Sequence, residues 1–160
     1  MALNNAKREI FVISDLHIGG RYPSGEALPG DRGFRMCTRV AELSRFVESL
    51  RARHVTGVDV ELVINGDFID FLAEESPAGG IFLPFIDDPE EAARRLDAIC
   101  KRDVIFFDAL AGFVSTGGRL TILLGNHDVE LSFPSVRQVL LSRLGGSIHK
   151  GIGFLYDGEG

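Results

Sequence analysis

Three short runs of apolar, largely β-branched residues are the clearest pattern along the chain. They are Ile10–Ile13, Val60–Ile64 and Leu120–Leu124. The apolar positions within each run are nearly continuous rather than strictly alternating, which is typical of strands that are covered on both faces. We therefore expect three covered strands.

Apolar residues at helical spacing fill the segments between these runs. The first expected helix extends from about Phe34 to Arg53. The second is longer: Asp88 fits the N-cap, Pro89 the first helical position and Glu91 the capping-box position, and Gly117-Gly118 ends the helix. The apolar stripe of this second helix comprises Ala92, Leu96, Ile99, Phe106, Leu110 and Phe113.

Strands that alternate with helices predict an α/β fold with a largely parallel sheet, flanking helices and right-handed crossovers. After the third strand, the pattern predicts a short helix from Pro134 to Leu144 and two extended pieces, near Ser147–Lys150 and Ile152–Tyr156. The 160 residues fall within the usual range for one domain, so we expect a single unit over residues 1–160.

Composition narrows the range of partners. With 45% hydrophobic and 25% charged residues, the chain has the profile of a folded soluble protein. Its formal net charge of -6 argues against a broad electropositive face, so extended nucleic acid is a less expected partner. A polyanionic substrate would have to be bound locally, by metal ions or by a few arginines.

The same pattern argues against export and membrane insertion. No apolar run approaches the roughly 20 residues of a membrane span. The first apolar run, from Ile10 to Asp15, is too short for a signal peptide. Cys37 and Cys100 lack CxxC spacing and fit buried thiols in a reducing compartment. We therefore expect a cytoplasmic protein.

Each apolar run leads directly into a cluster of residues that can bind metals. The carboxyl ends of neighbouring parallel strands open onto one crevice, so three such clusters are expected to converge. Asp15 and His17 are two residues apart, and extended backbone would send both side chains to the same side. Asp67 follows Gly66, which permits a tight turn and a close approach to an ion. Asn126 follows Gly125 in the same way.

The expected metal ligands are Asp15, His17, Asp67 and Asn126. Their mixture of carboxylate, imidazole and amide oxygen suits Mn, Fe or Zn better than Ca or Mg. Two such ions about 3.5 to 4 Å apart, bridged by Asp67, would polarise a phosphoryl oxygen and provide a hydroxide nucleophile. His127 is the expected proton donor to the leaving group, and Asp128 is expected to orient its ring through a hydrogen bond.

Structural roles remain open for the same residues. Asp and Asn at strand ends often cap helices and turns, and a His-carboxylate hydrogen bond can be purely structural. Asp70 could support the site through a hydrogen bond without binding the metal itself, or it could only stabilise its turn. Arg21, Arg32 and Arg35 could contact a substrate phosphate or be solvated loop side chains.

Taken together, the motifs resemble those of the calcineurin-like metallophosphoesterase family. The family pattern D-x-H, G-D-x-x-D and G-N-H-[DE] is matched by Asp15 with His17, by Gly66–Asp70 and by Gly125–Asp128. The resemblance implies a β-sandwich flanked by helices, of which this chain would form the first part.

The resemblance also implies roles for the individual residues. The first ion would be held by Asp15, His17 and Asp67, and the second by Asp67 and Asn126. The position of His127 is that of the proton donor.

The chain departs from the family pattern after Asp128, because it has no G-H-x-H element. His149 is the histidine that remains in this part of the chain, and it lacks the expected glycine and second histidine. We therefore expect residues 1–160 to be the first part of a longer domain. As a hypothesis, these residues alone would bind one metal weakly and show little or no turnover.

The expected function is metal-dependent phosphoester hydrolysis with a dinuclear centre and a metal-bound hydroxide nucleophile. The family acts on phosphomonoesters, phosphodiesters, nucleotides, nucleic acids and pyrophosphate-linked lipid precursors, so the substrate class stays open, with a small phosphoester or a nucleotide preferred here. The alternative from a different class is a non-catalytic scaffold or interaction module with the same type of fold.

Overall fold

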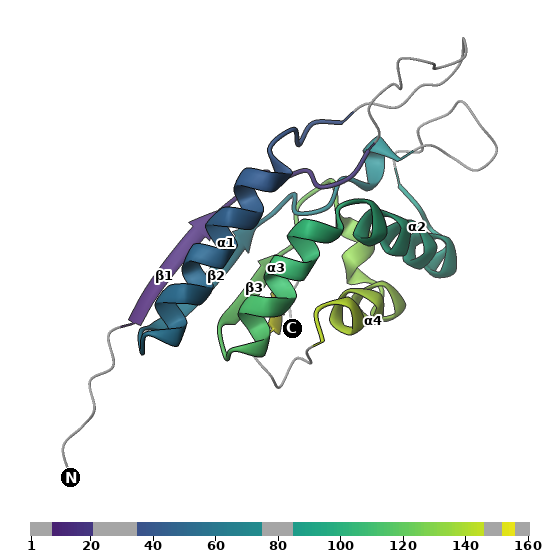
Figure 1. The fold of residues 1–160 in the computed structure, drawn as a ribbon. Coiled ribbons are helices and arrows are strands. Elements are labelled where there is room, and N and C mark those ends of the chain that lie inside the picture. The colour runs from purple at the N-terminus through teal and green to yellow at the C-terminus, as the bar shows by residue number, and fades with distance from the viewer. Residues whose placement is uncertain (1–7, 21–34, 75–84, 146–151, 156–160) are drawn as a thin grey trace.

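Four parallel strands form one sheet in which their spatial order follows the sequence, β1-β2-β3-β4 (Figure 1). The computed structural model describes residues 8–20, 35–74 and 85–145, and the backbone of residues 152–155. The elements are β1 Arg8–Ile13, α1 Val40–Val55, β2 Asp59–Asn65, η1 Phe71–Ala73, α2 Pro89–Arg102, α3 Val104–Ser115, β3 Arg119–Leu123, η2 Val129–Ser132, α4 Pro134–Arg143 and β4 Ile152–Leu155.

The three expected strands and their parallel arrangement are confirmed. Ile13 pairs with Ile64, and Ile64 pairs with Ile122, so residues from the three apolar runs lie side by side in one layer. The extended piece expected near Ile152 is also present as β4. The piece expected at Ser147–Lys150 lies outside the described residues.

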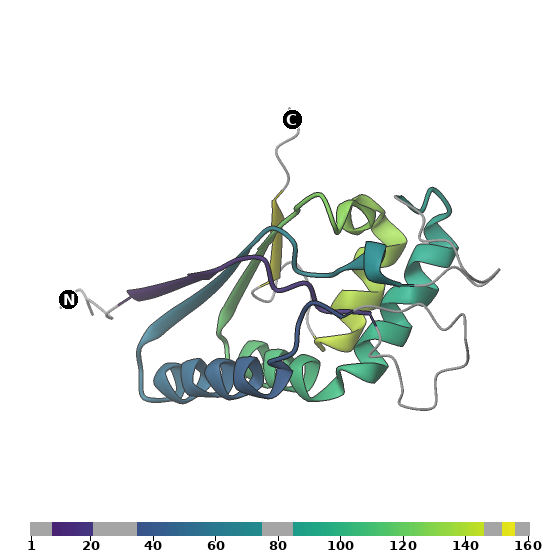
Figure 2. The same cartoon turned by 90° about the horizontal axis from the view of Figure 1, so that it is seen from above.

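The expectation that the strands are covered on both faces is wrong for β1. Helices α1 and α3 pack together on one face of the sheet (Figure 2), and that face buries Val60, Leu62 and Ile64. On the opposite face Ile10 is 53% exposed and Val12 is 62% exposed. Ile and Val favour extended backbone whether or not a layer covers them, so a continuous apolar run does not by itself indicate two covered faces.

The long second helix of the sequence pattern is in fact two helices. Its start is confirmed: the Asp88 carboxylate accepts hydrogen bonds from the N–H groups of Glu90 and Glu91. The helical run is interrupted at Asp103, which is buried and forms a bidentate ion pair with Arg35. The interruption lets α3 lie on the sheet while α2 packs against α4 near the carboxyl ends of the strands (Figure 2).

The two remaining helices agree with the expectation to differing degrees. Helix α4 is confirmed, with Pro134 in its first turn. Helix α1 begins at Val40, later than expected. The guanidinium of Arg35 donates to the carbonyl of Cys37 and pairs with Asp103, which holds the segment before α1 in a non-helical path.

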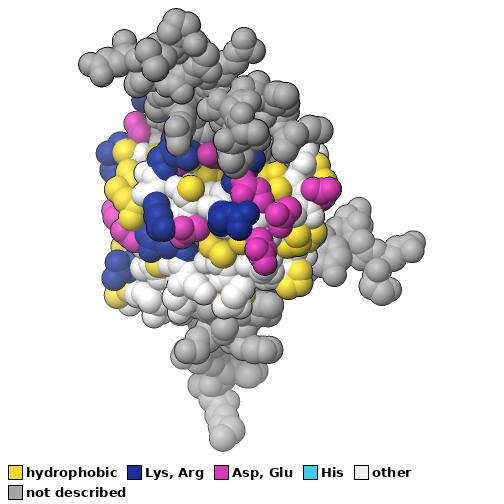
Figure 3. Space-filling model, turned by 90° about the vertical axis from the view of Figure 1, so that its right-hand side faces the viewer, with side chains coloured by type: hydrophobic (Ala, Val, Ile, Leu, Met, Phe, Trp, Pro, Cys, Tyr) yellow, Lys and Arg dark blue, Asp and Glu magenta, His cyan; other side chains and the backbone are white. Residues whose placement is uncertain are grey.

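The surface near α2 and α4 carries charges of both signs. Figure 3 shows basic and acidic side chains interspersed on this face. On α2, Lys101 pairs with Asp97, and Arg94 pairs with Glu91. Each such exposed pair contributes little to stability. Among the described helices, none combines the length and the apolarity that crossing a membrane requires.

Candidate metal centre

The loops that follow β1, β2 and β3 meet at the carboxyl end of the sheet. The N–H of Asp15 donates to the carbonyl of Gly66 at 3.3 Å, and the N–H of Gly66 donates to the carbonyl of Leu123 at 3.1 Å. The N–H of His17 then donates to the carbonyl of Asp67 at 2.9 Å. The parallel ladder therefore continues beyond the strands and brings the three motif-bearing loops together.

The backbone of this region is strained at the residues expected to bind metal. Among the described residues, positive φ outside glycine occurs at Asp15 (54°), His17 (45°) and Asp67 (49°). Residues with side chains rarely adopt this left-handed conformation, which costs about 1 to 3 kcal/mol each and is concentrated at functional sites. The extended backbone expected from Asp15 to His17 is therefore wrong, because both residues are left-handed.

Gly125 makes room for Asp67. A Cβ atom at Gly125 would lie 2.1 Å from Oδ1 of Asp67 and 2.3 Å from its backbone nitrogen, closer than any side chain permits. Oδ1 of Asp67 also accepts a hydrogen bond from the N–H of His127 at 3.0 Å. The loop after β3 is thus packed directly on the Asp67 carboxylate, which holds that carboxylate in place.

His17, Asp67 and His127 form a group that could hold a metal ion. One potential ligand atom from each of the three lies within 4.8 Å of those of the other two. Nε2 of His17 is 3.8 Å from Oδ2 of Asp67, which is too long for a hydrogen bond. The distance suits two ligands of one ion, because atoms that each lie about 2.0 to 2.2 Å from a metal are at most about 4.3 Å apart.

Asp70 lies between the two histidines and is completely buried. Its Oδ1 lies 3.1 Å from Nδ1 of His127 and also accepts the N–H of Ala73. Its Oδ2 lies 3.3 Å from Nδ1 of His17, although the contact lacks hydrogen-bond geometry. A carboxylate at these positions favours a proton on each Nδ1 and leaves Nε2 of His17 free to act as a ligand. Asp70 therefore stabilises its turn and also contacts both rings.

The expectation that Asp128 orients His127 is wrong, because Asp128 binds backbone groups instead. Its Oδ2 accepts the N–H of Phe68 at 2.7 Å and that of Ile69 at 3.3 Å, and its Oδ1 accepts the N–H of Gly125 at 2.6 Å. Burial raises the pKa of the Asp128 carboxyl, while these three donors oppose the shift. Asp128 joins the loops after β2 and β3, and the carboxylate at Nδ1 of His127 belongs to Asp70.

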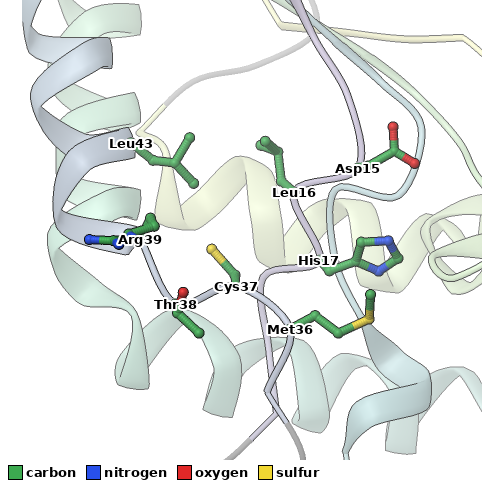
Figure 4. Close-up of a pocket in the computed structure, with 8 residues that line it drawn as sticks. All are labelled: Asp15, Leu16, His17, Met36, Cys37, Thr38, Arg39 and Leu43. Carbon is green, nitrogen blue, oxygen red and sulfur yellow. The ribbon is translucent and has the colours of Figure 1, made fainter.

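Asp15 and Asn126 are the other two expected ligands. Asp15 and Asn126 are exposed, and Asp15 is outside the set of three. Figure 4 shows the side chains of Asp15 and His17 leaving their loop on the same side. Of the expected histidine and carboxylate ligands, the group therefore contains His17 and Asp67 but not Asp15, and it adds His127, which was expected as a proton donor.

The arginines near the first motif have different outcomes. Arg21 and Arg32 lie outside the described residues. Arg35 is ion-paired with Asp103, and its side chain is only 7% exposed, so it serves the packing of the segment before α1.

In comparisons with known proteins, no family model and no curated protein matches this chain.

Proposed function

We propose that this protein is a metal-dependent phosphoester hydrolase of the calcineurin-like type. The observation that carries the proposal is the charge balance at the carboxyl end of the sheet. Among the described residues, the ion-pair partners of Asp67 and Asp70 are histidines rather than lysine or arginine. Buried or half-buried carboxylates without a cation are unfavourable, so a metal ion bound here would compensate them within the described part of the chain.

The donor set fits a transition metal. Imidazole and carboxylate together suit Mn, Fe or Zn. His17 and Asp67 would hold the first ion, with Asp15 beside them, and Asp67 with Asn126 would contribute to a second. When bound, divalent ions polarise the phosphoryl group and make a water-derived nucleophile accessible near neutral pH.

His127 is best suited to proton transfer. Its Nδ1 faces Asp70, and its side chain is 25% exposed, whereas that of His17 is 10% exposed. The ring can therefore reach a substrate through Nε2 while Asp70 holds the opposite nitrogen. From that position His127 would donate a proton to the leaving oxygen. Because His127 also belongs to the group that could hold a metal ion, the competing role is direct binding of that ion by its ring.

Metal binding and hydrolysis test the proposal in one variant series. The complete protein is titrated calorimetrically with MnCl₂, and hydrolysis of p-nitrophenyl phosphate and bis-p-nitrophenyl phosphate is then followed. We expect Asp67→Asn to lower both Mn affinity and turnover by at least about 100-fold, since it removes a direct ligand. His127→Gln should lower turnover strongly and Mn affinity little; an equal loss of both would make His127 a ligand.

The matched control is Glu61→Gln, which removes a carboxylate near the amino end of β2, the strand that leads into the Asp67 loop. It should leave both measurements unchanged. A complete protein that binds no Mn and hydrolyses neither ester would overturn the proposal and favour the non-catalytic scaffold.

A further inference from the structure

A cavity of about 330 Å³ opens directly beside Asp15 and His17 (Figure 4). The loop after β1, the segment before α1 and the first turn of α1 contribute its walls. Beyond the two metal-motif residues, the lining consists of Leu16, Met36, Cys37, Thr38, Arg39 and Leu43. The volume lies at the small end of the range for ligand pockets.

The walls of this cavity are largely apolar and held in place. Leu16 and Cys37 are buried, Leu43 is half-buried, and Met36 is 52% exposed. The carbonyl of Cys37 accepts a hydrogen bond from Arg35 at 2.8 Å, and Arg35 is in turn paired with the buried Asp103. This connection fixes the wall before α1 against the α2–α3 junction, so the pocket is formed before any ligand binds.

Arg39, the basic residue that lines the cavity, does not make the cavity a binding site for anions. The Arg39 side chain is 77% exposed, and its Nη1 lies 3.4 Å from Glu42 on the next turn. An anion in the pocket would face this neighbouring carboxylate and the Asp15 carboxylate. The apolar side chains therefore decide what the cavity favours, and burial of methylene groups against them is favourable.

We propose that this pocket binds the organic part of a phosphoester substrate, and that this part is a small apolar group such as a short alkyl chain or a single aromatic ring. The inference rests on the proposed function, which places the phosphoryl group at His17 and Asp67. With the phosphoryl group there, the ester substituent extends past Asp15 and His17 onto Leu16, Met36 and Leu43. A substrate with a second phosphate at this position is disfavoured.

A series of n-alkylphosphonates tests the inference by binding, without depending on turnover. Methyl-, propyl- and pentylphosphonate are titrated calorimetrically into the complete protein with MnCl₂ present. Affinity should rise by about twofold to fourfold per methylene until the pocket is filled. Met36→Gln and Leu43→Ala should each reduce this dependence on chain length. Because Met36 is half-exposed, its substitution should not impair folding.

The control is Val55→Gln, an exposed position at the far end of α1. It should leave the dependence on chain length unchanged. Metal-dependent binding that is equal for all three phosphonates would overturn the pocket inference and leave the proposed function intact. A dependence on chain length that survives both pocket substitutions, or that is the same without MnCl₂, would also overturn it. If none of the three phosphonates binds with MnCl₂ present, the inference is overturned, while the Mn titration and the hydrolysis assays decide the proposed function separately.

Discussion

Two charged clusters occupy opposite ends of the same three strands, and they differ in how their carboxylates are compensated. Toward the amino ends, Glu61 accepts hydrogen bonds from Arg8 at 2.6 Å and from the Thr121 hydroxyl at 3.0 Å, and Arg119 pairs with Asp59. At the carboxyl ends, Asp67 and the neighbouring Asp70 have histidine partners.

The comparison shows which features separate a structural cluster from a candidate site. The hydrogen bond from Arg8 is the main cause that lowers the pKa of Glu61, whose backbone is regular β-strand. At the other end, three of the expected ligands, Asp15, His17 and Asp67, have left-handed backbone, and burial raises the pKa of Asp128. Charge compensation and backbone conformation, rather than the number of carboxylates, distinguish the two clusters.

The largest effect should come from Asp128→Ala. The substitution removes the acceptor for three backbone N–H groups in the loops after β2 and β3. Leaving such donors unsatisfied should lower the free energy of unfolding by about 3 kcal/mol or more, measured by urea denaturation. Asp59→Ala, in the amino-end cluster, should cost less than about 1 kcal/mol because its pair is exposed. A loss of similar size in the two variants would contradict the proposed difference between the clusters.

The next effect concerns the histidines. Asp70→Asn keeps the oxygen that accepts from Ala73 and faces His127, but places an amide N–H near Nδ1 of His17. An N–H donor there would move the proton of His17 to Nε2, the atom that faces Asp67. A protonated Nε2 cannot bind a metal ion. Mn affinity should fall by roughly 10- to 100-fold, as expected for an outer-shell partner. An unchanged affinity in calorimetry would show that Asp70 only stabilises its turn.

These roles mark the limit of what local sequence patterns predict. The strands, the start of α2 at Asp88 and helix α4 depend on nearby residues, and all were predictable. The break between α2 and α3 was not, because Asp103 is held by Arg35, which is 68 residues away. The exposed face of β1 escaped prediction for a related reason: which face the helices cover is decided by tertiary packing.

The candidate site shows the same division. Parallel strand order made the meeting of the three loops predictable. Which carboxylate reaches His127 was not predictable, because Asp128 adjoins His127 in sequence whereas Asp70 is 57 residues away, and the backbone path decides between them. The apolar wall formed by Met36 and Leu43 also had no signal, since both are ordinary residues of an amphipathic segment.

A smaller effect is expected at Glu130, which is buried within η2. Its Oε1 accepts the N–H of Ile86, its Oε2 has no hydrogen-bond partner among the described residues, and burial raises the pKa of its carboxyl. The folded state therefore holds the proton more tightly than the unfolded state, so Glu130 reduces stability as the pH rises above the ordinary glutamate range. Glu130→Gln should raise the free energy of unfolding by about 1 kcal/mol near pH 8.

The gain from Glu130→Gln should disappear near pH 4, where the wild-type carboxyl is protonated in both states. Denaturation curves across this range test the sign. A gain that is independent of pH would show that the negative charge of Glu130 is compensated in the folded protein. Glu130 would then resemble Glu61 and Asp59 at the amino ends of the strands.

The smallest effect, and one of opposite sign, is expected for Glu61→Gln. Because the pKa of Glu61 is lowered on folding, its contribution to stability is present at neutral pH and is lost as the pH falls through the folded-state value. The substitution should cost less than about 1 kcal/mol at pH 7, and the cost should shrink in acid. Mn affinity should not change, since Arg8 and Thr121 already compensate this carboxylate. If Glu61→Gln weakened Mn binding, the two ends of the sheet would be coupled, and charge compensation could not serve to tell a structural cluster from a metal site.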